Sequence, residues 1–211
     1  MRNLRGRCKW APAGTPGPPE ADVVEDVKSP TPRVPGQSAT RTEIDARLTV
    51  ELASVVSAAR RRALRDGDRQ IDTAHLLHSL IETDPEVRTA LGDVAQVARV
   101  LGYLVQRSIG YGLRWQGSVE DSGAVPLVRG AVVRGGHADM SGWSPSAVIA
   151  LERAIGRAGL RGDHRAGGVD LLACIAADRA CRAVEVLGRA GVDAELLTER
   201  LAASSRHVSQ G

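Results

Sequence analysis

Few residues in this chain of 211 have the type and spacing for chemistry. His75 and His78 lie three positions apart in the segment DTAHLLHSLIETD, and Asp72 opens that segment. A zinc site needs three or four ligands with supporting hydrogen bonds, and no further group of ligands lies nearby in the sequence. We therefore expect no bound metal.

The cysteines indicate the compartment rather than a reaction. Cys8, Cys174 and Cys181 are too few for a disulfide framework and form no C-x-x-C pair. Buried free thiols in a reducing cytoplasm are the simplest interpretation. The basic N-terminus is followed by no apolar core of a secretion signal, and no apolar run reaches the roughly 18–20 residues of a membrane span. We expect a cytoplasmic protein with no membrane partner.

Two large classes of enzyme leave characteristic patterns that this sequence lacks. No G-x-x-x-x-G-K-[ST] motif is present to hold a nucleotide phosphate. No arrangement of Ser, His and an acidic residue indicates a nucleophile. We therefore predict that the chain is not an enzyme and needs no cofactor.

The charge balance does not favour a nucleic-acid partner. The formal net charge is only +3, although the isoelectric point is near 9. A cluster of arginines (Arg60, Arg61, Arg62 and Arg65) most simply forms a solvated helix face. The alternative is that this face binds an acidic partner or nucleic acid.

The elements that position these residues are predicted to be helices. Phe is absent and aromatic residues make up 2% of the chain, while Ala, Leu, Arg and Val dominate, which favours an all-α fold. Residues 46–109 show four stretches with helical spacing of apolar residues. Their expected N-caps or first residues are Thr49, Asp72 or Thr73, Pro85 and Asp93.

A second set of four helices is predicted over residues 143–203. Ser144 is the expected cap of its first helix, with Pro145 at the first helical position. A glycine-rich linker, 110–142, separates the two sets, and residues 204–211 form a flexible C-terminus. Residues 1–42 hold seven of the ten prolines and no apolar periodicity, so we expect a disordered tail, either without function or used for docking.

The two sets are copies of one unit. A shift of 95 residues places Ala59, Arg62, Ala63, Gly67, Asp68, Leu76 and Leu77 on identical residues of the second set. A constant offset that preserves a helix-ending glycine and a Leu-Leu pair indicates internal duplication. Each copy has one apolar face, and stacking the copies buries both faces.

This duplicated unit resembles the Clp repeat, the N-terminal domain of Clp-type AAA+ unfoldases. The resemblance lies in Leu48-Thr49 with AARRRALRDG and IDTAHLLHSLIETDPEVRTAL, and in WSPSAVIALERAIGRAG, GGVDLLACI and LGRAGVDAELL of the second copy. It covers about residues 46–203. It implies two tandem four-helix Clp repeats packed pseudo-symmetrically. It also implies a non-catalytic domain that recognises substrates and adaptors.

The resemblance also implies where ligands bind. The family holds phosphoarginine with a hydroxyl at a helix start, an Arg two positions later and a Glu from a T-E-H segment. Here Thr49 and Ser144 keep the hydroxyls. The other positions differ in both copies: Glu51 and Ser146 replace the Arg, and Ala74 and Val169 replace the Glu. We therefore expect peptide or apolar ligands rather than phosphoarginine.

Trp143 lies where the family often has an aromatic residue, and two interpretations stay open. It is either a hydrophobic staple onto the following helix or one wall of a peptide groove. With no ATPase motif in the chain, we expect a stand-alone recognition domain whose Arg-rich, Lys-poor composition is similar to that of actinobacterial examples. Its expected role is adaptor, decoy or regulator of a Clp unfoldase or protease, with Clp components, their substrates or peptides as partners. The alternative is a helical nucleic-acid-binding regulator.

Overall fold

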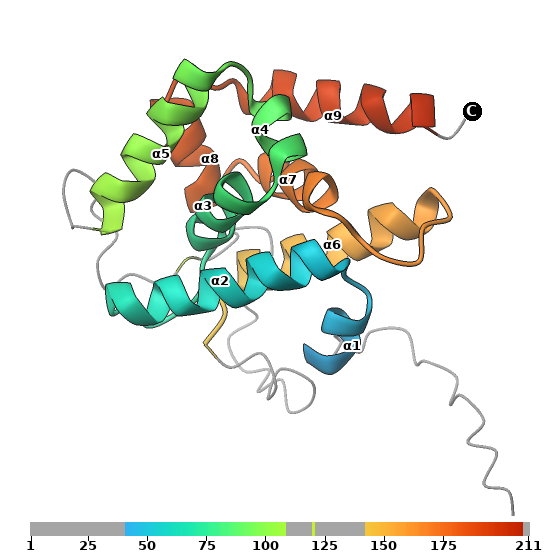
Figure 1. The fold of residues 1–211 in the computed structure, drawn as a ribbon, viewed down its shortest axis with the longest axis horizontal. Coiled ribbons are helices and arrows are strands. Elements are labelled where there is room, and N and C mark those ends of the chain that lie inside the picture. The colour runs from blue at the N-terminus through green and yellow to red at the C-terminus, as the bar shows by residue number, and fades with distance from the viewer. Residues whose placement is uncertain (1–40, 109–119, 121–141, 209–211) are drawn as a thin grey trace, which may run out of the picture. The chain divides into compact units, whose positions relative to one another are not determined.

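The computed structural model describes residues 41–108, 120 and 142–208. Over these ranges the fold is all-α, and the only extended pairing is two isolated bridges (Figure 1). The helices are α1 (Arg41–Ala46), α2 (Val50–Asp66), α3 (Thr73–Thr83), α4 (Pro85–Leu91), α5 (Val94–Ser108), α6 (Pro145–Leu160), α7 (Gly168–Ala176), α8 (Arg182–Arg189) and α9 (Ala194–Val208). Most of the predicted tail and linker lies outside the described residues.

The first helices of the two copies begin in the same way. Thr49 caps α2 by accepting a hydrogen bond from the backbone N–H of Leu52 at 3.2 Å, and Ser144 caps α6 through Ala147 at 3.1 Å. Both caps satisfy N–H groups that have no partner within the helix. The chain then reverses at Gly67 and Gly162 with φ of 72° and 87°, a left-handed conformation that costs glycine little.

The two copies interlock through a pair of symmetric backbone contacts. Leu48 forms a parallel bridge with Ala166, and Ile71 forms one with Trp143. The shift of 95 residues that relates the two copies places Leu48 on Trp143 and Ile71 on Ala166, so each bridge is the counterpart of the other. The hydrogen bonds obey the same rule, since Thr49 N–H donates to Ala166 and Ser144 N–H donates to Ile71, both at 2.9 Å. The predicted pseudo-symmetric packing of the two repeats is therefore confirmed.

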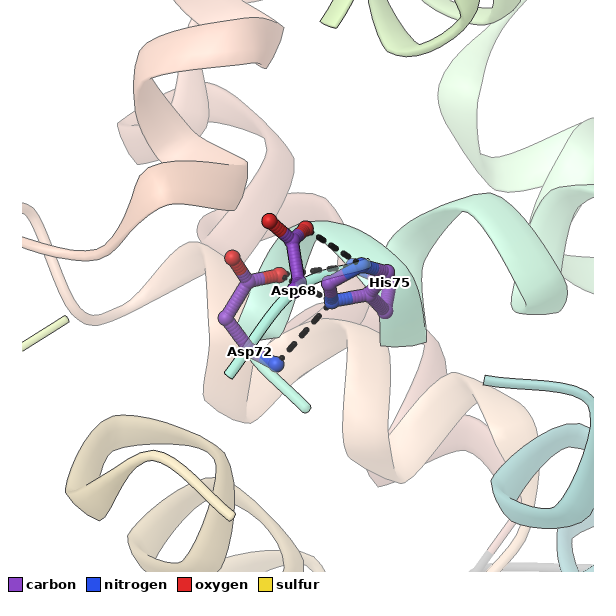
Figure 2. A group of neighbouring side chains, drawn as sticks. All are labelled: Asp68, Asp72 and His75. Atoms are coloured by element: carbon purple, nitrogen blue, oxygen red, sulfur yellow. Dashed lines mark hydrogen bonds and ion pairs between the residues drawn. The ribbon is translucent and has the colours of Figure 1, made fainter. Parts of the chain in front are cut away.

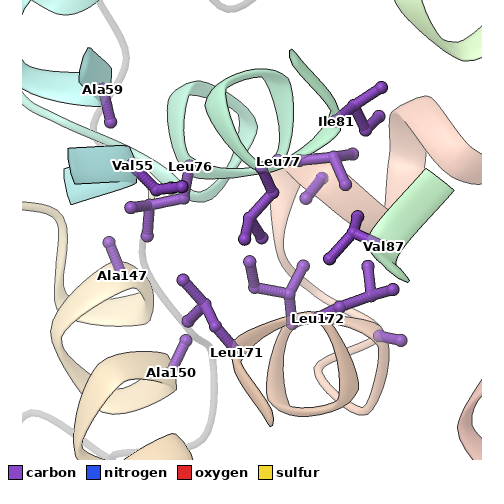
Figure 3. Packing of buried hydrophobic residues seen from close by; sticks show 14 of the residues in the cluster. Val55, Ala59, Leu76, Leu77, Ile81, Val87, Ala147, Ala150, Leu171 and Leu172 are labelled. Atoms are coloured by element: carbon purple, nitrogen blue, oxygen red, sulfur yellow. The ribbon is translucent and has the colours of Figure 1, made fainter. Parts of the chain in front are cut away.

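The shared core lies where α3 and α7 meet. Figure 3 shows Leu76 and Leu77 of α3 facing Leu171 and Leu172 of α7, and all four side chains are fully buried. Burying each leucine stabilises the fold by about 1.5–3 kcal/mol. Neither copy can cover this apolar surface alone, which is why the duplication folds as one unit.

Two features extend past the predicted helices. Helix α1 was not predicted, yet its Ile44 is 1% exposed and belongs to the core. Helix α9 continues to Val208, past the end expected near residue 203. None of the described helices is both long enough and apolar enough to cross a membrane.

Candidate functional site

A cavity of about 960 Å³ opens where the start of α2 meets the start of α7. We call it the open site. It brings together Thr49, the cap of α2, and Val169, in the first turn of α7, which come from different copies. Its other lining residues are Glu86, Thr89, Ala90, Arg161, Asp163, His164, Arg165, Gly167, Gly168, Asp170, Arg200 and Leu201.

An ion-pair network holds one wall of the open site. Arg161 donates to Asp163 and to Asp170, both at 2.8 Å, and Arg157 lies 3.2 Å from Asp170. The hydrogen bonds with Asp170 raise the pKa of Arg161 above its usual value. Asp170 also accepts from the backbone N–H of Gly167 at 3.1 Å, which fixes the start of α7. The charges of this wall are therefore paired with one another.

The matching position in the other half of the fold, at the starts of α6 and α3, is occupied by the side chain of Glu120. We call it the closed site. There the carboxylate of Glu120 accepts hydrogen bonds from Ser144 Oγ at 2.6 Å, from Thr73 N–H at 2.9 Å and from Arg182 N–H at 2.7 Å, and it is also bonded to the Thr73 hydroxyl. The donors stand at the starts of α6, α3 and α8. Glu120 is only 3% exposed.

The predicted ligand residues therefore do not share one surface. Thr49 and Val169 line the open site, but Ser144 and Ala74 are completely buried. Glu51 is exposed. Two predicted residues remain. Ser146 is buried, and its hydroxyl has no hydrogen-bond partner among the described residues, while Trp143 is half-buried against the core.

Asp68, Asp72 and His75 gather around the start of α3 (Figure 2). Their ligand atoms lie within 4.8 Å of one another, the spacing of a possible metal site. His75 instead closes a capping box, because its Nδ1 accepts from Asp72 N–H at 3.1 Å while Asp72 accepts from His75 N–H at 3.0 Å. Its Nε2 lies 3.0 Å from Asp68.

Two arginines neutralise the carboxylates of this group. Arg107 donates to Asp68 at 3.0 Å and also to Asp72, and Arg182 donates to Asp72 at 2.7 Å. Burial alone would raise the pKa of Asp72, but His75 and the two arginines hold it well below its usual value. A cation added here would face two guanidinium groups, so this donor set fits a structural ion-pair network better than a metal.

Sequence reasoning missed Glu120 and Arg182. Glu120 lies in a glycine-rich stretch with no periodicity, so nothing local marks it as a ligand of three distant helices. Arg182 looks like any arginine at a helix start. Only its position between two carboxylates, Asp72 through its side chain and Glu120 through its backbone, shows its role.

The described cysteines are poor nucleophiles. Burial raises the pKa of the Cys174 thiol to about 11 and that of Cys181 to about 12. Both thiols are therefore protonated near neutral pH, whereas cysteine chemistry requires the thiolate.

Comparisons with known proteins locate the fold. No family model matches the sequence, and no curated protein matches it. Among solved structures, the N-terminal domain of the caseinolytic protease associated chaperone ClpD from Arabidopsis thaliana is 20% identical, with a TM-score of 0.52, over 76% of this chain and 95% of that one. A structure from an investigation of a malarial protein secretion system is 14% identical, also with a TM-score of 0.52, over 75% of this chain and 95% of that one.

Both similarities are at the level of fold, and both span nearly the whole of the matched chain. The described helices, in residues 41–108 and 142–208, therefore have the fold of a Clp N-terminal domain.

Proposed function

We propose that this chain is a non-catalytic protein-interaction module of a Clp system, acting as an adaptor, decoy or regulator of substrate recognition. The observation that carries the proposal is the open site. It is a cavity of about 960 Å³ between two helix starts, in a fold shared with the N-terminal domain of a Clp-associated chaperone.

The lining of the open site suits a peptide segment. Val169, Ala90 and Leu201 offer apolar contacts, while Arg165 and Arg200 stand among its charged residues. Ligand sites of this kind combine apolar walls with a few polar groups that orient the ligand. Val169 stands where the family's carboxylate would meet a guanidinium, so this surface favours peptide over phosphoarginine.

The absence of catalysis is part of the proposal. It is supported by the two protonated thiols and by the engagement of His75 in the cap of α3. Free thiols also suit a reducing cytoplasm, which we propose as the compartment.

The experiment measures binding of the full chain to fluorescein-labelled dephosphorylated casein, an unfolded substrate, and to a purified Clp unfoldase. Val169→Glu places a charge in the open site and should weaken binding about tenfold, the effect of about 1.4 kcal/mol. The control is Val94→Glu, which adds the same charge at a residue that is 86% exposed and outside the open site. Equal affinities for the two variants would overturn the proposal.

Two further titrations separate the alternatives. Tight, saturable binding of phosphoarginine in calorimetry would contradict the ligand preference. The nucleic-acid alternative predicts a gel shift that weakens steeply between about 50 and 200 mM salt. Arg60, Arg61 and Arg65 are exposed, while Arg62 is paired with Glu82 and Arg65 lies 3.9 Å from Asp66. We expect no such shift.

A further inference from the structure

We propose that the closed site is an oxyanion-binding site and that Glu120 is its resident ligand, supplied by the chain itself. The site takes a carboxylate or a phosphate when the side chain of Glu120 is absent. This inference does not depend on the proposed function, because it concerns only groups within the described fold.

The donor set is built for an anion. Two hydroxyls, of Thr73 and Ser144, and two backbone N–H groups, of Thr73 and Arg182, converge on one carboxylate. Hydrogen bonds to an ionised acceptor are about twice as strong as neutral ones. All four donors belong to residues that are buried, so the site is preformed rather than assembled from mobile surface groups.

Three helix starts supply the positive potential. Ser144 caps α6, Thr73 is the first residue of α3 and Arg182 is the first residue of α8. Each helix start carries partial positive charge that favours an anion. The guanidinium of Arg182 is bonded to Asp72 instead, so it is the backbone of Arg182 that binds Glu120.

The open site shows that this donor set is specific to one half. The residue matching Thr73 is Gly168, which has no hydroxyl, and α4 begins with Pro85, which has no N–H to match that of Arg182. Two of the four donors therefore have no counterpart at the starts of α7 and α4.

The test is anion rescue of Glu120→Ala in the full chain. Melting temperatures of wild type and variant are compared in sodium phosphate, sodium acetate and sodium chloride at equal ionic strength. Comparing phosphate with acetate shows which of the two anions the site binds more tightly once the Glu120 side chain is removed. At about tenfold its dissociation constant, a bound anion should raise the melting temperature of the variant by about 3–5 °C more than that of wild type.

Three controls make the result decisive. Glu199→Ala removes an exposed carboxylate and should show no anion rescue beyond that of wild type. Glu120→Gln leaves a side chain of similar size in the site, so added phosphate or acetate should raise its melting temperature less than that of Glu120→Ala. Adding Thr73→Val to Glu120→Ala removes one hydroxyl donor and should reduce the rescue.

A poorly folded variant still gives an answer. If Glu120→Ala is unfolded in chloride, then phosphate or acetate must restore its helical circular dichroism. Equal responses of Glu120→Ala, Glu199→Ala and wild type to all three salts would overturn the proposal.

Discussion

The open and closed sites occupy matching places in the two halves of the fold, yet they differ in what they hold. In the closed site Ser144, Thr73 and Arg182 surround the carboxylate of Glu120. In the open site Thr49 and Gly168 border a cavity of about 960 Å³. The backbone contacts beside both sites are nearly identical, with 2.9 Å bonds from Thr49 to Ala166 and from Ser144 to Ile71.

A few substitutions account for this divergence. Gly168 brings α7 so close to Asp84 that a Cβ there would lie 2.0 Å from the Asp84 carboxylate, whereas the matching Thr73 uses its side chain to bind Glu120. Duplication preserved the hydroxyl caps of the first helices, Thr49 and Ser144, while other side chains at the helix starts changed. The two sites can therefore acquire different ligands without any change of fold.

The largest expected effect tests the pseudo-symmetry on which the comparison depends. Leu76→Ala and Leu171→Ala should each lower the free energy of unfolding by about 2–5 kcal/mol, because both side chains are fully buried. Urea unfolding followed by circular dichroism measures this. Leu160→Ala, at a residue 92% exposed, should change stability by less than about 0.5 kcal/mol. If either core variant were as stable as the parent, the matching of Leu76 with Leu171 as equivalent core residues would be contradicted.

The next prediction concerns the difference between Gly168 and Thr73. Gly168→Ala should cost about 1–3 kcal/mol, because the new Cβ displaces Asp84, whose carboxylate caps α4 through Glu86 and Val87. Gly156→Ala in α6 meets nothing within 4 Å and should instead stabilise the fold by about 0.5–1 kcal/mol. Effects of the same sign in thermal unfolding would contradict the close approach at Gly168.

The two caps should differ because only one of them contacts Glu120. Thr49→Ala loses one capping bond and should cost about 1 kcal/mol. Ser144→Ala loses the equivalent bond and also the 2.6 Å bond to Glu120, so it should cost about 1 kcal/mol more. A double-mutant cycle of Ser144→Ala with Glu120→Ala measures that extra coupling. Purely additive costs would show that the Ser144 hydroxyl and Glu120 do not stabilise each other.

The smallest expected effect is a pH dependence of stability that arises from His78 in the first copy. Burial, together with the charge of Arg62, lowers the pKa of His78 to about 4. An unfolded histidine titrates near 6.5 and binds a proton first, so stability is complete above pH 6.5 and declines as the pH falls toward 4. We expect about 1 kcal/mol less stability at pH 5 than at pH 7.

The matching residue of the second copy is Ala173, which suggests the control. His78→Ala should flatten this part of the pH profile of urea unfolding, whatever its cost at pH 7. An unchanged slope between pH 7 and pH 5 in that variant would assign the dependence to other groups.

Much of the fold was predictable because its signals are local. The caps Thr49, Asp93 and Ser144, and Pro85 at the start of α4, mark helix starts within a single turn of chain. The offset of 95 residues is visible in side-chain identities and is confirmed by the two backbone bridges. Helix α1 was missed because a six-residue helix with one buried residue, Ile44, leaves too weak a pattern.

Only some of the candidate site could be predicted, because local signals do not show which residues the folded chain buries. Thr49 and Val169 were identified from their matched positions, and they do line one cavity. Whether the equivalent Ser144 and Ala74 would be accessible could not be read from their matched positions, because their burial depends on neighbours from other helices.

The sequence by itself determined helices α2 to α9, the helix-start residues Thr49, Pro85, Asp93 and Ser144, the duplication and the shared leucine core. These depend on spacing within a turn and on comparing one copy with the other. Only the tertiary structure decided that Glu120 fills one site and that the other stays open. The carboxylate of Glu120 contacts its donors, in Thr73, Ser144 and Arg182, only after the chain has folded. These residues lie far apart in the sequence, so no local pattern predicts the contacts.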